Sequence, residues 1–162
     1  MGWLQIVAVI ITIGLNALDG FDVMSISFAS PGIASEWHLD NTALGFVLSM
    51  ELIGMALGSI LLGGVADRIG RRPTVLGCLF AMAIGMLMAT QATSVVDLSV
   101  WRVLTGLGIG GMLAAVNAVV AEFSNAPRKN LNVALMAIGY PIGAVVGGII
   151  VEHLLKGHSW RS

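Results

Sequence analysis

The chain of 162 residues is 57% hydrophobic, carries only 10% charged residues and has a mean hydropathy of +0.93. Soluble domains carry about 25% charged residues, so this composition excludes an ordinary soluble domain and indicates a membrane protein. The formal net charge is −1, and the sequence has no basic patch that suggests binding to nucleic acid. The one cysteine, Cys78, lies in an apolar run, so neither a disulfide nor a cysteine metal site is predicted within the chain.

Five apolar segments follow one another, and we predict a helix over about residues 3–28, 42–66, 73–91, 97–123 and 131–154. Each segment is long enough to cross about 30 Å of hydrocarbon at roughly 1.5 Å per residue. Pro31-Gly32 is expected to end the first helix, and Pro73 suits the first turn of the third. The sequence therefore predicts an all-α membrane protein.

The densest charge lies between Gly63 and Arg72, where we expect a short loop outside the hydrocarbon, because a charge at the bilayer centre costs about 2.5–3.5 kcal/mol. A second basic loop is expected at Arg128 and Lys129, and the other two loops have no Lys or Arg. Positive loops favour the cytoplasm, so the N-terminus is predicted to be cytoplasmic. Lys156 and Arg161, after the fifth helix, weakly oppose this orientation.

Glycines recur four positions apart on three of the predicted helices: Gly54 and Gly58; Gly106 and Gly110; and Gly139, Gly143 and Gly147. In lipid, small residues at this spacing let two helix backbones approach closely. We therefore expect helices that pack tightly against one another, with a weak internal repeat that restarts at the fourth helix. Pro141 is expected to bend the fifth helix.

Ionisable residues at membrane depth indicate function. Asp19 and Asp22 share a helix face with Thr12 and Asn16, and Arg102 is predicted at a similar depth, roughly 8–14 Å below the outer surface at 1.5 Å per residue. An Asp–Arg pair is therefore possible, and two interpretations stay open. The pair can simply neutralise buried charge, or one carboxylate can take up and release a proton while Arg102 binds a substrate carboxylate.

Other polar residues have less specific roles. Glu51, midway along the second helix, has no predicted partner and is either a second proton site or a protonated packing residue. Asn117 joins Asn16 and Arg102 as a candidate substrate contact. Glu122 is expected to pair with Arg71 or Arg72.

Several classes of chemistry have no residues to support them. The histidines are scattered at positions 38, 153 and 158, which predicts no metal site, and no phosphate-binding loop is present. We therefore expect neither a cofactor nor an enzyme, and any transport must use an ion gradient or the gradient of the substrate.

Two motifs resemble a known family. Gly63-x-x-x-Asp67-Arg68-x-Gly70-Arg71-Arg72 resembles motif A of the major facilitator superfamily, and Arg102-x-x-x-Gly106-x-Gly108-x-Gly110 resembles its motif B. Asp19-Gly20-Phe21-Asp22 is similar to a signature of its aromatic acid:proton symporter branch. Drug exporters of the superfamily have Pro where Ala144 stands, which favours a symporter here.

The resemblance implies a partial bundle, about five of twelve helices, from the N-terminal part of a multi-pass transporter in a bacterial inner membrane. It implies alternating access, proton-coupled symport of small organic anions such as aromatic carboxylates, and a gating role for the Gly63–Arg72 motif. The implied partners are the substrate, protons, the lipid bilayer and the remaining helices of the full-length protein. Two alternatives stay open: a facilitator or symporter for sugars or other metabolites, and a receptor or subunit that does not transport.

Overall fold

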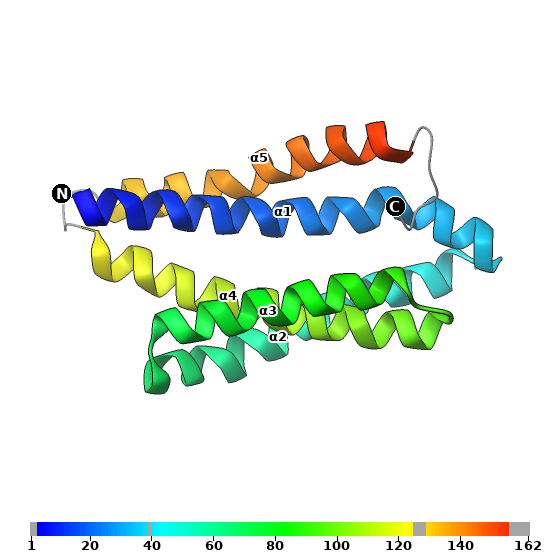
Figure 1. Ribbon diagram of the computed structural model, residues 1–162, viewed down its shortest axis with the longest axis horizontal. Helices are drawn as coiled ribbons and strands as arrows, with labels where there is room; N and C mark the ends of the chain where they lie inside the picture. Colours follow the sequence, from blue (N-terminus) through cyan, green and yellow to red (C-terminus); the bar gives the residue numbers. More distant parts are fainter. Residues whose placement is uncertain (1–2, 39, 125–128, 156–162) are drawn as a thin grey trace. The chain divides into compact units, whose positions relative to one another are not determined.

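The computed structural model describes residues 3–38, 40–124 and 129–155, and these ranges form five helices (Figure 1). They are α1 (Trp3–Trp37), α2 (Asn41–Ile69), α3 (Arg71–Thr90), α4 (Val95–Phe123) and α5 (Lys129–Leu155). No strand occurs in the described ranges, so the predicted all-α class is confirmed.

All five helices are long and apolar enough to cross a membrane, judged by length and composition. Large apolar side chains on α2, α3 and α5 are strongly exposed, with Ile60 75%, Phe80 70% and Val145 64% accessible. Water penalises apolar surface of this extent, whereas lipid tails do not. These helix faces therefore suit contact with lipid.

Helix α1 continues through Pro31 and Gly32 to Trp37, so the predicted break at these residues is wrong. A proline inside a helix removes one backbone hydrogen bond and leaves the turns on either side in place. Ending the helix would instead leave several backbone groups without intrahelical partners, which an apolar environment penalises more strongly. Helix α5 likewise contains Pro141 without ending there.

The charged stretch from Gly63 to Arg72 is almost entirely helical, and the predicted loop is reduced to Gly70. Helix α2 runs on to Ile69, and α3 begins at Arg71. Gly70 turns the chain with φ of 100° and ψ of 157°, a conformation that side chains strongly disfavour, and its N–H donates to the carbonyl of Ala66 at 3.1 Å. A single glycine is therefore enough to connect the two helices.

Helix α4 begins two residues before the predicted position, because its N-terminus is capped by side chains. The Ser94 hydroxyl accepts from the N–H of Asp97 at 3.1 Å, and the Asp97 carboxylate accepts from the N–H of Thr93 at 3.2 Å. The same carboxylate accepts from the Trp101 indole at 2.9 Å. The bond to Ser94 satisfies a backbone N–H that a helix start leaves without an intrahelical partner, and the two bonds to Asp97 hold its side chain at this end of the helix.

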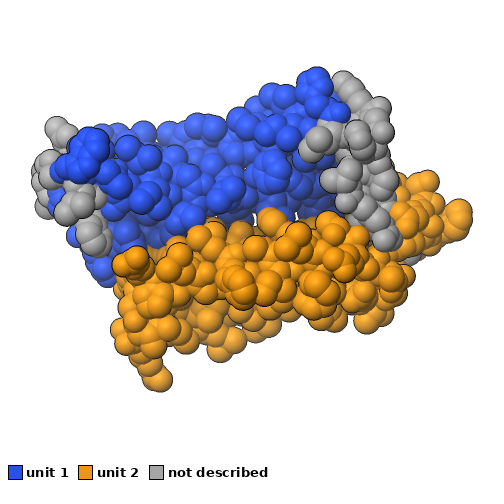
Figure 2. Space-filling model, viewed as in Figure 1, with its two compact units in different colours: residues 1–29, 116–158 blue, residues 30–115, 159–162 orange. Residues whose placement is uncertain are grey.

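The chain forms two compact units (Figure 2). Unit 1 comprises Met1–Ala29 and Val116–His158, which include most of α1, the end of α4 and α5. Unit 2 comprises Ser30–Ala115 and Ser159–Ser162, which include the end of α1, α2, α3 and most of α4.

In unit 2, glycines bring α4 against both α2 and α3. A Cβ on Gly106 or Gly110 would collide with the main chain of α2, at Glu51 and Met55. A Cβ on Gly108 would lie 2.8 Å from the carbonyl oxygen of Cys78 on α3. Two faces of α4 are therefore free of side chains where its neighbours approach, and α4 packs between them at backbone distance.

In unit 1, α1 and α5 run side by side, as Figure 1 shows. A Cβ on Gly143 would collide with the carbonyl of Ala17, and one on Gly147 would lie 2.8 Å from the Phe21 ring. In return, a Cβ on Gly20 of α1 would collide with the carbonyl of Tyr140. The predicted tight packing through glycines thus occurs in both units.

Candidate functional site

Buried polar side chains lie within the apolar helices of both units. In unit 1 they include Thr12, Asn16, Asp19 and Asp22 of α1, and in unit 2 Glu51 of α2 and Arg102 of α4. Burying a charge is costly unless it has a partner, so these positions need a physical explanation.

For Glu51 and Arg102 in unit 2, the explanation is a buried ion pair. Arg102 Nη1 donates to Glu51 Oε2 at 3.3 Å, and the two side chains are only 8% and 5% exposed. The prediction that Glu51 lacks a partner is therefore wrong. Within unit 2, the ion-pair partner of Arg102 is Glu51. The predicted pairing of Arg102 with Asp19 or Asp22 concerns residues of different units and stays a prediction.

Glycine contacts fix the position of this pair. Gly106, one turn after Arg102, lies against the carbonyl of Glu51, and Gly54, one turn after Glu51, lies against the carbonyl of Val103. The backbones that carry the two charges therefore meet directly, with no side chain between them. This geometry places the carboxylate and the guanidinium on the same side of the α2–α4 contact.

The other charged side chains that the structure describes in unit 2 lie near helix ends. They are Glu36, His38, Asp40, Asp67, Arg68, Arg71, Arg72 and Asp97. Glu51 and Arg102 are thus the charged residues that the described part of unit 2 places about two turns or more from the ends of α2 and α4.

In unit 1 the polar residues of α1 have different environments. The Thr12 hydroxyl donates to the carbonyl of Val9 at 2.8 Å within the helix. The Asn16 amide donates to the carbonyl of Met136 on α5 at 2.7 Å, and therefore links the two helices. Asp19 and Asp22 are buried, and Oδ1 of Asp19 accepts no hydrogen bond from the described residues.

The remaining predicted contact residues are less enclosed. Asn117 is exposed and lies about four helical turns after Arg102 along α4. Glu122 is exposed near the end of α4. The predicted pairing of Glu122 with Arg71 or Arg72 stays a prediction.

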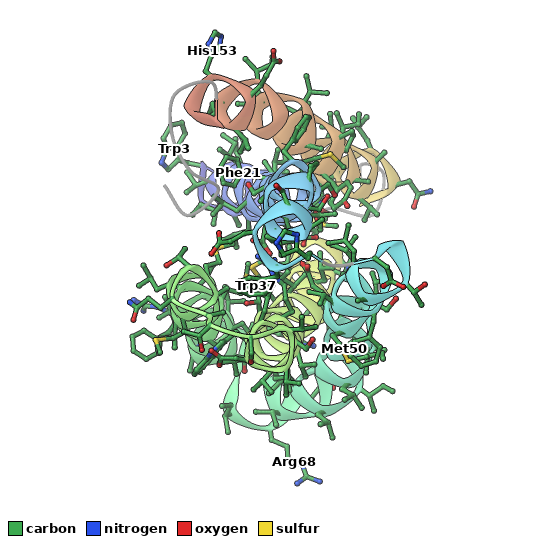
Figure 3. The ribbon with its side chains drawn as sticks, turned by 90° about the vertical axis from the view of Figure 1, so that its right-hand side faces the viewer. Trp3, Phe21, Trp37, Met50, Arg68 and His153 are labelled. Atoms are coloured by element: carbon green, nitrogen blue, oxygen red, sulfur yellow. The ribbon has the colours of Figure 1, made fainter. Side chains whose placement is uncertain are left out.

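The Gly63–Arg72 stretch has its own ion pair. Arg71 Nη2 lies 2.8 Å from Asp67 Oδ1 across the Gly70 turn, with side-chain exposures of 26% and 65%. Arg68 projects outward from the end of α2 (Figure 3), and Arg72 is also exposed. Gly63 is close to α4, where its Cβ would be 3.5 Å from the Cβ of Ala114. Of the residues used to predict orientation, Arg128, Lys156 and Arg161 lie outside the described residues, and so do His158 and Trp160.

Sequence reasoning missed the Glu51–Arg102 pair, although a usable signal was present. Each residue precedes a glycine by one turn, Gly54 or Gly106, on a helix whose glycines recur four apart. Gly54 marks the side of α2 on which Glu51 lies, and Gly106 marks the side of α4 on which Arg102 lies. If these two sides pack against each other, the two charges are predicted to pair. In the described part of the chain, no group of three or more His, Cys, Asp or Glu side chains is arranged to hold a metal ion.

Comparison with known proteins supports the reading of the motifs. The chain is 34% identical over 145 residues to the 4-hydroxybenzoate transporter PcaK of Pseudomonas putida, an overlap of 90% of this chain and 32% of that protein. It is 31% identical to a gallate transporter of Pseudomonas putida, over 89% of this chain and 32% of that protein. It is 29% identical to a gentisate transporter of Corynebacterium glutamicum, over 97% of this chain and 36% of that protein.

The chain thus spans about a third of the length of the curated relatives it matches. The family profile described as Major Facilitator Superfamily matches residues 12–162. This range contains the stretches that resemble motifs A and B, and the Glu51–Arg102 pair. The chain belongs to the major facilitator superfamily.

Proposed function

We propose that the chain is the N-terminal part of a proton-coupled symporter that imports aromatic carboxylates by alternating access. The observation that carries the proposal is a cationic side chain, Arg102, buried within an apolar helix of a chain whose relatives transport aromatic acids. A guanidinium suits a carboxylate because its planar fork can donate two parallel hydrogen bonds.

The residues have separate proposed roles. Arg102 binds the carboxylate of the substrate, and Asn16 contributes a further polar contact. Asn117, about four helical turns from Arg102 on α4, is proposed to contact the substrate at another stage of its passage. Asp19, Asp22 and Glu51 take up and release protons, because each is a buried carboxylate in an apolar helix. A proton that accompanies the anion neutralises its charge, which lowers the cost of moving it through the protein.

The Gly63–Arg72 stretch is proposed to control access and not to contact substrate. Its charges, on Asp67, Arg68, Arg71 and Arg72, lie at the connection between α2 and α3, where a change in pairing can accompany helix movement. Gly63, Gly70 and Glu122 belong to the same proposed gate. We also propose that the N-terminus and this connection face the cytoplasm of a bacterium, with the protein in the inner membrane.

Uptake by membrane vesicles that contain the complete protein tests this proposal. Radiolabelled 4-hydroxybenzoate is expected to accumulate when an inward pH gradient is imposed, and a protonophore is expected to abolish accumulation. Gallate, gentisate, benzoate, cis,cis-muconate and a neutral sugar serve as competitors. Strong competition by the sugar alone would indicate a sugar transporter, and binding without uptake would indicate a receptor; either result overturns the proposal.

Three single variants test the roles inside the site. Asp19→Asn, Asp22→Asn and Arg102→Ala are each expected to abolish uptake driven by the pH gradient. Exchange of labelled for unlabelled substrate, without a gradient, separates coupling from binding, because a loss of coupling alone leaves exchange intact. Normal uptake in all three variants would contradict the assignment.

A further inference from the structure

The α1–α5 contact of unit 1 and the α2–α4 contact of unit 2 are built in the same way. Gly143 lies against the carbonyl of Ala17, as Gly54 lies against that of Val103. Gly20 lies against the carbonyl of Tyr140, with the nitrogen of Ala144 3.0 Å from its ideal Cβ.

The matching contact in unit 2 is that of Gly106. It lies against the carbonyl of Glu51, with the nitrogen of Met55 3.0 Å from its ideal Cβ. The residue numbers of matching positions in α1 and α4 differ by one constant value, and those of matching positions in α5 and α2 differ by another. The helix contact is therefore repeated residue by residue.

This repeat assigns a counterpart to each member of the buried ion pair. Arg102, which precedes Val103, corresponds to Asn16, which precedes Ala17. Glu51 corresponds to Tyr140. Where unit 2 has a carboxylate and a guanidinium, unit 1 therefore has the phenol of Tyr140 and the amide of Asn16, both uncharged.

The α1–α5 contact shows which features of the α2–α4 contact are needed for helix packing. The α1–α5 contact forms with the same glycine geometry and uncharged residues at these two positions, so the geometry does not require an ion pair there. Such a pair also costs desolvation energy at both groups, and apolar replacements are often as stable. The observed distance of 3.3 Å is longer than the 2.7–2.9 Å typical of charge-assisted bonds. The charges are thus additional to what the helix contact needs.

We propose that Glu51 occupies Arg102 in place of the substrate and leaves it when a substrate carboxylate arrives. This inference rests on the proposed function. In the empty site the Glu51 carboxylate neutralises Arg102. When the anion binds Arg102, Glu51 takes one proton from the aqueous phase and becomes neutral, because an uncompensated carboxylate is unfavourable in an apolar site. When the anion leaves, the proton returns to water and the ion pair re-forms.

The exchange couples one anion to one proton through a single arginine. Arg102 on α4 is the charged side chain of unit 2 that lies 3.3 Å from the Glu51 carboxylate. Before binding, the Glu51 carboxylate offsets the charge of Arg102. After binding, the substrate carboxylate does so while Glu51 is protonated, so the total charge of the site is the same in both states.

The test measures anion binding and proton uptake together, with the complete purified protein in weakly buffered solution. Binding of 4-hydroxybenzoate is followed by calorimetry, and proton uptake by a pH indicator. Glu51→Gln is expected to take up about one proton fewer per bound anion than the wild-type protein. It is also expected to bind the anion about tenfold or more tightly, since a competing charge worth at least about 1.5 kcal/mol is removed.

Glu51→Asp gives a second, independent measurement if Glu51→Gln does not fold. The shorter side chain keeps its charge but competes less well for Arg102, so tighter anion binding with proton uptake retained is expected. A purely structural pair predicts the opposite, because weakening it would loosen the site and weaken binding.

The double variant Glu51→Tyr/Arg102→Asn is the matched control, because it places the uncharged pair of unit 1 in unit 2. It is expected to fold and not to bind the anion. Unchanged proton uptake in Glu51→Gln, or weaker binding in Glu51→Asp, would overturn the exchange. If the wild-type protein binds no aromatic carboxylate, the proposed function itself fails, so the two failures are distinguishable.

Discussion

Gly106 of α4 lies directly against the main-chain carbonyl of Glu51 on α2, with no space for even a methyl group between them. This contact sets the distance between the two helices at the level of the buried ion pair. The stability of unit 2 therefore depends on residue 106 having no side chain, and a substitution at Gly106 measures this dependence.

Gly106→Ala is expected to lower the free energy of unfolding by about 1–3 kcal/mol, the usual cost of overpacking a well-packed contact. The added methyl group meets a backbone carbonyl, which cannot move aside as a flexible side chain can. Thermal unfolding in detergent, followed by tryptophan fluorescence, measures the effect. Gly77→Ala on α3 is the control, since nothing lies within 4 Å of its Cβ. Equal stability of the two variants would contradict the close contact.

Removing one member of the ion pair is expected to destabilise unit 2 more than removing both. Arg102→Leu leaves Glu51 without its ion-pair partner and is expected to cost about 3–5 kcal/mol, whereas Glu51→Leu/Arg102→Leu is expected to be neutral or stabilising. A double-mutant cycle of unfolding free energies measures the coupling between them. If the effects of Arg102→Leu and Glu51→Leu added up to that of the double variant, the two residues would not interact.

Gly70→Ala is expected to cost about 1–3 kcal/mol, because φ of 100° with ψ of 157° is accessible almost only to glycine. The same substitution is predicted to slow transport, since Gly70 is the whole connection between α2 and α3. Gly64→Ala, at an exposed position on the same end of α2 with no atom near its Cβ, is the control. Initial uptake rates and unfolding temperatures are compared, and a tolerated Gly70→Ala would argue against a strained turn.

Asp67→Asn is expected to slow turnover while substrate affinity stays within a few-fold of the wild-type value. The Asp67–Arg71 pair is partly exposed and spans the turn between α2 and α3, so its loss is worth only about 0.2–1 kcal/mol of stability. Any large change in rate is therefore an effect on gating. Rates of uptake and direct binding are measured on the same preparation. A large loss of affinity with normal turnover would instead place Asp67 in substrate binding.

Asn16→Leu is expected to weaken the α1–α5 contact by about 0.6 kcal/mol, the mean for hydrogen bonds between membrane helices. Its amide donates to the carbonyl of Met136, so part of its role is structural. Unfolding temperature reports that part, and substrate affinity reports the proposed contact with the anion. A loss of stability without a change in affinity would remove Asn16 from the binding site.

The differences between expected and observed helices have separate physical reasons. Pro31 and the charges near Arg68 were expected to end helices, because local preference is against them there. At Pro31, an apolar environment makes backbone hydrogen bonds matter more than local preference, so α1 continues. At the end of α2, Asp67 and Arg68 are exposed, so the helix continues to Ile69 without burying their charges. At Gly70, the residue type alone permits the observed backbone conformation, so the connection between α2 and α3 lies there.

The sequence by itself determined the number of helices, their apolar character and the glycines through which they pack. These properties follow from composition and from spacing along one helix, which need no knowledge of other elements. The sequence also identified Glu51 and Arg102 as buried charges of interest. Only the tertiary structure decided that they pair with each other, because pairing depends on which helix faces meet. Gly54 and Gly106 bring those faces together, and contacts between residues far apart in the chain cannot be derived from the spacing along either helix alone.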